Sequence, residues 1–149
     1  MSVDDDPQRV AEAAAAAMWA GDVASQALGM ELVEVGPGRA VLRMTVRADM
    51  VNGHAIGHGG LTFALADSAF AFACNSYDRR TVAAGAEIRF WAPTHQGEVL
   101  TASATERERD ARSGVYDVEV SNGAGVVATF VGHSREIGGS FSAATPSAD

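Results

Sequence analysis

Hydrophobic and polar residues alternate with a period of two in several short stretches of the chain, which predicts β-strands. In one of them Ala40, Leu42 and Met44 alternate with polar residues. The same reasoning predicts further strands over residues 30–35, 86–91, 100–105, 116–120 and 126–131. Turn residues at 36–38 and 122–123 separate neighbouring strands, and Pro93 ends the strand that precedes it.

Helical patterns occupy two other parts of the chain. Residues 7–28 are predicted to be helical with a break near Gly21, after which Asp22 caps a second short helix. The stretch from Leu61 to Cys74 has apolar residues on every side of a helix, so this helix is expected to be buried all round. It contains one carboxylate, Asp67. A lone carboxylate in such a place is costly unless it is paired, solvated or functional.

The order of these elements indicates an α+β fold in a single domain over residues 1–149. Two strands, a long buried helix and four more strands suit a curved antiparallel sheet wrapped around the helix. One face of the sheet then covers the helix, and the other meets solvent or another subunit. The segment 1–28 is the N-terminal helical part. The sequence beyond residue 138 is small and polar, and residues 140–149 are expected to form a flexible tail.

Charge and composition exclude some functions. The chain of 149 residues has a net charge of −8, and its eleven cations are all arginines, which disfavours general nucleic-acid binding. An anionic ligand would need a local cluster, for which Arg107, Arg109 and Arg112 are one candidate and the pair at 79–80 another. Solvated strand ends explain both equally well. The sequence has no membrane span and no secretion signal, so a cytoplasmic protein is expected. The single cysteine, Cys74, is expected to fill core space.

A glycine-rich loop leads directly into the apolar helix. Gly59 and Gly60 fall where the helix should begin, and free N–H groups at a helix N-terminus can bind a carbonyl oxygen under attack. A tight turn is the alternative explanation. Asp67 lies eight residues further on, about 12 Å along the axis. If Gly59 and Asp67 serve one reaction, a second copy running the opposite way must bring them together, as in a twofold dimer.

Other polar residues near this loop are open to two interpretations. Asn52 can bind a thioester or orient a water, or it can stabilise its own loop. His54 and His58 have a metal-binding spacing, but the spacing crosses an expected loop with no third ligand, so no metal is expected. His58 is better explained as fixing the loop. Ser68 lies in no nucleophile elbow, and the sequence has no dinucleotide or phosphate-loop pattern.

The run from Asn52 to Ser76, with the strand over 86–93 and the ending 132–139, resembles the hotdog-fold acyl-CoA thioesterases of the phenylacetyl-CoA type. The resemblance implies that Asp67 is the catalytic carboxylate. It also implies that the Gly59 N–H binds the thioester carbonyl and that Asn52 acts near the water or the thioester. Asp67 would come from one subunit and the other two residues from its partner, in a dimer that pairs into a homotetramer.

The sequence thus predicts an acyl-CoA thioesterase that acts on an aromatic, phenylacetyl-like acyl group, a reaction of phenylacetate degradation. Asp67, Gly59 and Asn52 are the expected catalytic residues, and His58, Gly60 and Ser68 the expected substrate-binding residues. The reaction needs no metal or redox cofactor. One alternative is a non-catalytic module that binds or senses acyl-CoA. Another is a hotdog enoyl-CoA hydratase. The related hydratases carry a histidine five residues after the aspartate, where this chain has Phe72.

Overall fold

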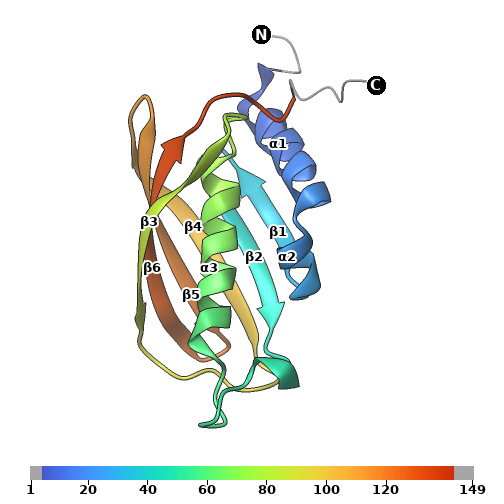
Figure 1. Cartoon of the computed structure of the whole chain (residues 1–149), viewed down its shortest axis with the longest axis vertical. Helices are drawn as coiled ribbons and strands as arrows, with labels where there is room; N and C mark the ends of the chain where they lie inside the picture. The colour runs from blue at the N-terminus through green and yellow to red at the C-terminus, as the bar shows by residue number, and fades with distance from the viewer. Residues whose placement is uncertain (1–4, 143–149) are drawn as a thin grey trace.

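A long helix lies against the concave face of a curved antiparallel sheet (Figure 1). The computed structural model describes residues 5–142. Within them the helices and strands are α1 (Pro7–Gly21), α2 (Val23–Ala27), β1 (Glu31–Gly36), β2 (Arg39–Thr45), a short 3-10 helix (Ala48–Met50), α3 (Gly59–Cys74), β3 (Thr81–Phe90), β4 (Val99–Arg109), β5 (Ser113–Asn122) and β6 (Gly125–Glu136). This is the predicted order, and it confirms the α+β hotdog arrangement.

The six strands form one sheet in the order β1-β2-β4-β5-β6-β3, with antiparallel neighbours throughout. The predicted alternation is confirmed in β2, where Ala40, Leu42 and Met44 are buried and their neighbours are more exposed. Strands β4 and β5 repeat this pattern. The buried faces of the strands meet α3 and form the core with it. Strand β3 lies at one edge, and most of its residues are exposed.

Helix α3 is not buried all round, contrary to the expectation from its composition. Leu65, Phe70 and Phe72 are almost fully buried. A stripe on another side, which includes Phe63 and Asp67, is only half-buried. Members of this stripe recur every three or four residues, so they share one face of the helix. The apolar composition of α3 predicts that this face is covered, but the single chain leaves it half-exposed.

The N-terminal helices break where the sequence predicts. Helix α1 ends at Gly21, and the Asp22 carboxylate caps α2 by accepting a hydrogen bond from the Ser25 N–H at 3.0 Å. At the other end of the chain, residues up to Ser142 contact the turn after α3, where the Asp78 carboxylate accepts a hydrogen bond from the Phe141 N–H at 2.9 Å. The rest of the predicted flexible tail, residues 143–149, lies outside the described residues. No described helix is both long and apolar enough to cross a membrane.

Candidate functional site

The N-terminus of α3 is held by a histidine cap. His58 precedes the helix, and its ring Nδ1 accepts a hydrogen bond from the Gly60 N–H at 2.9 Å. The His58 carbonyl accepts hydrogen bonds from the N–H groups of Leu61 and Thr62. Among the described residues the Gly59 N–H has no acceptor. The first turn of α3 therefore keeps one amide, that of Gly59, available to a ligand at the positive end of the helix dipole.

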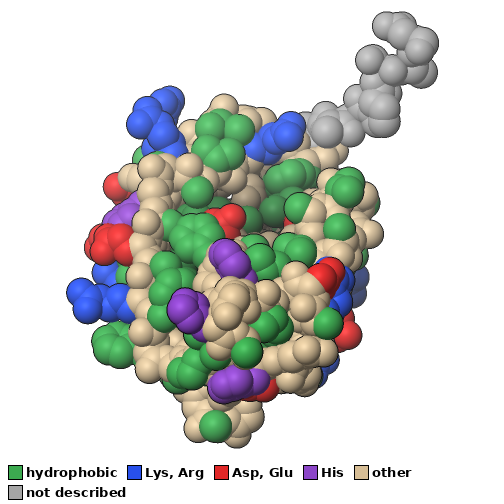
Figure 2. Space-filling view, turned by 60° about the horizontal axis from the view of Figure 1, so that its bottom comes forward, with side chains coloured by type: hydrophobic (Ala, Val, Ile, Leu, Met, Phe, Trp, Pro, Cys, Tyr) green, Lys and Arg blue, Asp and Glu red, His purple; other side chains and the backbone are tan. Residues whose placement is uncertain are grey.

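A cavity of about 400 Å³ opens beside this amide. Figure 2 shows the end of the molecule that carries the loop before α3, where histidine and hydrophobic side chains gather around a hollow. Aromatic and apolar groups from the end of β3 and from the segment that follows it form much of the cavity wall, and Asn52 and Gly59 contribute polar groups. The lining residues are Asn52, Ile56, Gly57, Gly59, Thr62, Phe90, Trp91, Ala92, Pro93, Thr94 and Val127.

Asn52 has two roles open to it, and the structure shows how they combine. Its side-chain oxygen accepts hydrogen bonds from the N–H groups of His54 and Ile56, at 2.9 and 3.4 Å, so it does stabilise its own loop. These bonds fix the orientation of the amide, because only the oxygen can accept from a backbone N–H. The side-chain NH₂ makes no hydrogen bond within the described part of the chain and is left to donate into the cavity that Asn52 lines.

Asp67 does not belong to this cavity. It lies two helical turns beyond Gly59, about 12 Å along the axis, on the half-buried face of α3. Burial raises the pKa of the Asp67 carboxyl above its ordinary value. Its carboxylate has no hydrogen bond or ion pair within the described residues. A partly desolvated carboxylate without a partner is a typical candidate for acid–base chemistry. The structure thus brings Asn52 and Gly59 together and leaves Asp67 apart from them.

Two of the expected substrate-binding residues are engaged inside the chain. The Gly60 N–H is used by the His58 ring, and the Ser68 hydroxyl lies 2.8 Å from the hydroxyl of the buried Ser25 on α2. These contacts tie the loop and α2 to α3. A substrate would have to replace them in order to use either group. Substrate binding by His58, Gly60 and Ser68 stays a prediction.

Several functional candidates were not anticipated from the sequence. Phe90 ends β3 and Trp91 follows it; their side chains are 55% and 60% exposed and line the cavity. A Cβ atom on Gly59 would lie 3.0 Å from the tip of the Phe90 ring, so a side chain at this position would crowd the cavity beside the Gly59 amide. Two adjacent aromatic residues directly before Ala92 and Pro93 interrupt the strand alternation. This interruption is the feature of the sequence that could have indicated a role for them.

Other reactive groups are accounted for by the core. Burial raises the pKa of the Cys74 thiol to about 12, so this cysteine is a core residue and not a thiolate nucleophile. No three or more histidine, cysteine or acidic side chains gather in a metal-binding arrangement within the described residues.

Comparison with known proteins decides the family. The family model described as "Thioesterase superfamily" matches residues 54–129, which include the first turn of α3, Asp67 and the cavity wall from β3. The chain belongs to the thioesterase superfamily. This thioesterase is 44% identical to the acyl-coenzyme A thioesterase PaaI of Escherichia coli over 126 residues, which cover 84% of the chain and 90% of that protein.

Solved structures agree with this assignment. The E. coli PaaI protein from the phenylacetic acid degradation operon superposes with a TM-score of 0.89 at 43% identity, over 91% of this chain and 99% of that one. A mutant of the phenylacetic acid degradation protein PaaI from Thermus thermophilus gives a TM-score of 0.74 at 36% identity, over 76% of this chain and 97% of that one. The resemblance, the hotdog fold and the thioester hydrolase class expected from the sequence are therefore confirmed.

Proposed function

We propose that this thioesterase hydrolyses the thioester of an acyl-CoA with an aromatic, phenylacetyl-like acyl group, releasing the free acid and coenzyme A. The observation that carries the proposal is the cavity in which the Gly59 amide and the Asn52 NH₂ have no acceptor in the described chain. Two donors beside one cavity suit a carbonyl oxygen that gains negative charge. The relatives named for acyl-CoA hydrolysis and for phenylacetic acid degradation support the substrate class.

The proposed active site is shared between two subunits. Strand β3 is a long edge strand with an unpaired side, and an exposed edge of this kind is a template for pairing with another chain. Beside it lies the half-buried face of α3 that carries Asp67. Pairing two β3 strands around a twofold axis makes the helices antiparallel. Asp67 of one subunit can then approach the cavity at Gly59 of the other subunit, although the two residues are about 12 Å apart along the helix of one chain.

In the proposed mechanism the thioester carbonyl accepts hydrogen bonds from the Gly59 N–H and the Asn52 NH₂. Asp67 of the partner subunit takes a proton from a water molecule as that water attacks the carbonyl carbon. The tetrahedral intermediate collapses, the carbon–sulfur bond breaks, and coenzyme A leaves as a thiolate, which picks up a proton from solvent. In the variant of this mechanism, the partner's Asp67 attacks directly and forms a mixed anhydride, which water then hydrolyses. Neither route uses a metal or a redox cofactor.

The cavity walls support an aromatic acyl group. The Phe90 and Trp91 rings and Pro93 present flat apolar surfaces, and aromatic groups pack well against each other in offset or edge-to-face arrangements. The Trp91 ring is held in place by its N–H, which donates to the Thr129 hydroxyl at 2.8 Å. We therefore expect phenylacetyl-CoA to have a higher kcat/KM than acetyl-CoA or a long-chain acyl-CoA.

The rival functions on this fold make different demands. A hydratase would need a titratable group near the aspartate, but Phe72 is buried and packs against the Trp19 ring at a centroid distance of 6.1 Å. A sensing module would bind acyl-CoA and leave it intact. Purified protein is incubated with a panel of acyl-CoAs and a thiol reagent, and enoyl-CoA absorbance is followed in parallel. Thiol release that is fastest with aromatic substrates supports the proposal. Binding without thiol release, or enoyl-CoA consumption alone, contradicts it.

The oligomer and the location belong to this proposal as well. We propose a homodimer formed through β3 that pairs further into a homotetramer, in the cytoplasm. Sedimentation of the purified protein gives the oligomeric state directly. A protein that stays monomeric at all concentrations, yet fully active, contradicts the shared site.

A further inference from the structure

The two groups proposed to hold the thioester carbonyl belong to one short loop. Asn52 lies near the start of this loop, and Gly59 follows its end as the first residue of α3. An isolated β-bridge between Val51 and Gly57 folds the loop back on itself. The distance between the Asn52 NH₂ and the Gly59 N–H therefore depends on how residues 51–58 are held against the rest of the chain.

The segment between β3 and β4 holds this loop. The Gly57 N–H donates a hydrogen bond to the Thr94 carbonyl at 2.7 Å. The segment that carries Thr94 is tied in turn to the residue after β2, because the Gly97 N–H donates to the Val46 carbonyl at 2.8 Å. Thr94 also lines the cavity beside Gly59. The loop is thus attached to a part of the chain that is itself fixed, at the wall of the proposed catalytic cavity.

Gly57 and Thr94 lie so close together that position 57 has no space for a side chain. A Cβ atom there would lie 1.9 Å from Thr94 Oγ1 and 3.2 Å from Thr94 Cβ. Gly57 is not one of the glycines with a positive φ, so a glycine is required here by sterics and not by backbone conformation. Thr94 is only 5% exposed and has two heavy atoms on its Cβ, which leaves it few other rotamers. A side chain at position 57 would therefore push the loop away from Thr94 by about 1 Å.

We propose that Thr94 is a positioning residue for thioester hydrolysis. Its side chain packs on Gly57 and, through the loop, sets the place of the Asn52 NH₂ and the Gly59 N–H, so that both reach one carbonyl oxygen. Donors to such an oxygen act at about 2.7–3.1 Å, and a displacement of about 1 Å can lower the rate about 100-fold. Because it assumes that these two donors hold the carbonyl, this role of Thr94 rests on the proposed function.

The test is a double-mutant cycle between positions 57 and 94, with hydrolysis of phenylacetyl-CoA followed by thiol release. Gly57→Ala should lower kcat about 100-fold. Thr94→Ala should have a much smaller effect, at most about tenfold, because it keeps the carbonyl that accepts the Gly57 N–H. The double variant lacks Oγ1, and the closest contact from its new methyl group to residue 94 is the one of 3.2 Å to Cβ. Its kcat should therefore be at least about tenfold higher than that of Gly57→Ala.

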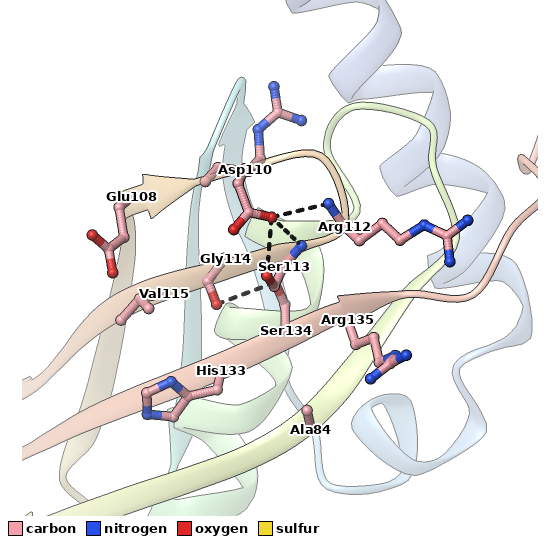
Figure 3. Close-up of a pocket in the computed structure, with 11 residues that line it drawn as sticks. Ala84, Glu108, Asp110, Arg112, Ser113, Gly114, Val115, His133, Ser134 and Arg135 are labelled. Carbon is pink, nitrogen blue, oxygen red and sulfur yellow. Dashed lines mark hydrogen bonds between the residues drawn. The ribbon is translucent and has the colours of Figure 1, made fainter.

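Two other glycines provide matched controls. Gly53→Ala changes the same loop at a position where the Cβ would meet nothing within 4 Å, so it should keep both kcat and stability. Gly114 on β5 lies beside Ser134 in a hollow of about 590 Å³ (Figure 3), which shares no lining residue with the proposed catalytic cavity. A Cβ on Gly114 would lie 3.0 Å from Ser134 Oγ, so Gly114→Ala should lose stability in urea and keep its kcat. A fall in kcat that is confined to position 57 separates positioning from general destabilisation.

NMR reports the position of the loop without turnover. The signals of the Gly59 N–H and the Asn52 NH₂ should shift in Gly57→Ala and return toward their wild-type positions in the double variant. A wild type that releases no thiol contradicts the proposed function alone, and the NMR signals then decide the role of Thr94. Wild-type kcat or unshifted signals in Gly57→Ala overturn the inference. So does a Thr94→Ala variant that is as slow as Gly57→Ala, or a double variant that regains stability in urea but not kcat.

Discussion

Replacing Asp67 with asparagine separates catalysis from stability. Asparagine keeps the size and shape of the side chain but cannot take a proton from water. Loss of a general base of this kind lowers kcat by about 100-fold or more. We expect that loss in the release of thiol from phenylacetyl-CoA. In the wild type, kcat/KM should rise with pH through the pKa of Asp67, which burial places above the ordinary value for an aspartate.

The same substitution should stabilise the fold at neutral pH. Because burial raises the folded-state pKa of Asp67 above its unfolded value, the carboxyl contributes stability while protonated, below its unfolded pKa. That contribution is lost as pH rises through the folded pKa, and at neutral pH the buried charge is unfavourable. Asp67→Asn removes the charge. Urea unfolding should show a more stable variant at neutral pH, with the difference shrinking toward about pH 4.

Asp49→Asn is the matched control, because Asp49 is exposed and pairs with Arg47 at 3.0 Å. Its kcat should equal that of the wild type, and its stability should not increase at neutral pH. Near-wild-type kcat in Asp67→Asn would remove Asp67 from the mechanism. If Asp67→Asn instead loses stability together with activity, the carboxylate holds the fold and our reasoning about its burial is refuted.

Three further substitutions test the surroundings of the site. Gly59→Val should lower kcat about 100-fold, because its side chain crowds the place of the carbonyl oxygen. The loss of stability should be modest, because the Cβ lies 3.0 Å from the exposed Phe90 ring, which can move. Full activity would mean that this glycine serves only the turn. Gly132→Ala should destabilise by about 1–3 kcal/mol, measured by urea unfolding, because its Cβ would lie 2.6 Å from the buried Phe70 ring; an unchanged midpoint would show that the core adapts. Ser68→Ala should cost about 1 kcal/mol in urea unfolding through its lost bond to α2, and it should raise KM for phenylacetyl-CoA if Ser68 binds substrate as expected; an unchanged KM would leave Ser68 with a structural role alone.

Much of the fold could be predicted because its signals are local. The alternation of Ala40, Leu42 and Met44 reports which face of β2 is buried, and the break at Gly21 reports the end of α1. Strand β3 was expected only from residue 86, but it begins at Thr81. Its first half is small and exposed in the single chain, so it lacks the buried face that produces alternation.

The site was harder to predict because its parts meet through tertiary structure. The sequence indicated Gly59 as the start of α3, because a glycine-rich loop followed directly by an apolar run can be recognised from neighbouring residues. It could not show that the Asn52 oxygen is used by its own loop while the NH₂ remains unused. Nor could it show that Phe90 and Trp91 close the cavity wall, because the end of β3 and the start of α3 are brought together only by the fold.

The central claim, that Asp67 acts on a thioester held by the partner's Asn52 and Gly59, is tested most directly by mixing two inactive variants. Asp67→Asn and Asn52→Ala are purified separately, unfolded together and refolded. In a mixed dimer one site carries both substitutions and the other carries neither. Random pairing makes about half of the dimers mixed, so about a quarter of wild-type activity should return. If mass spectrometry confirms mixed dimers and no activity returns, the residues do not share a site across the interface.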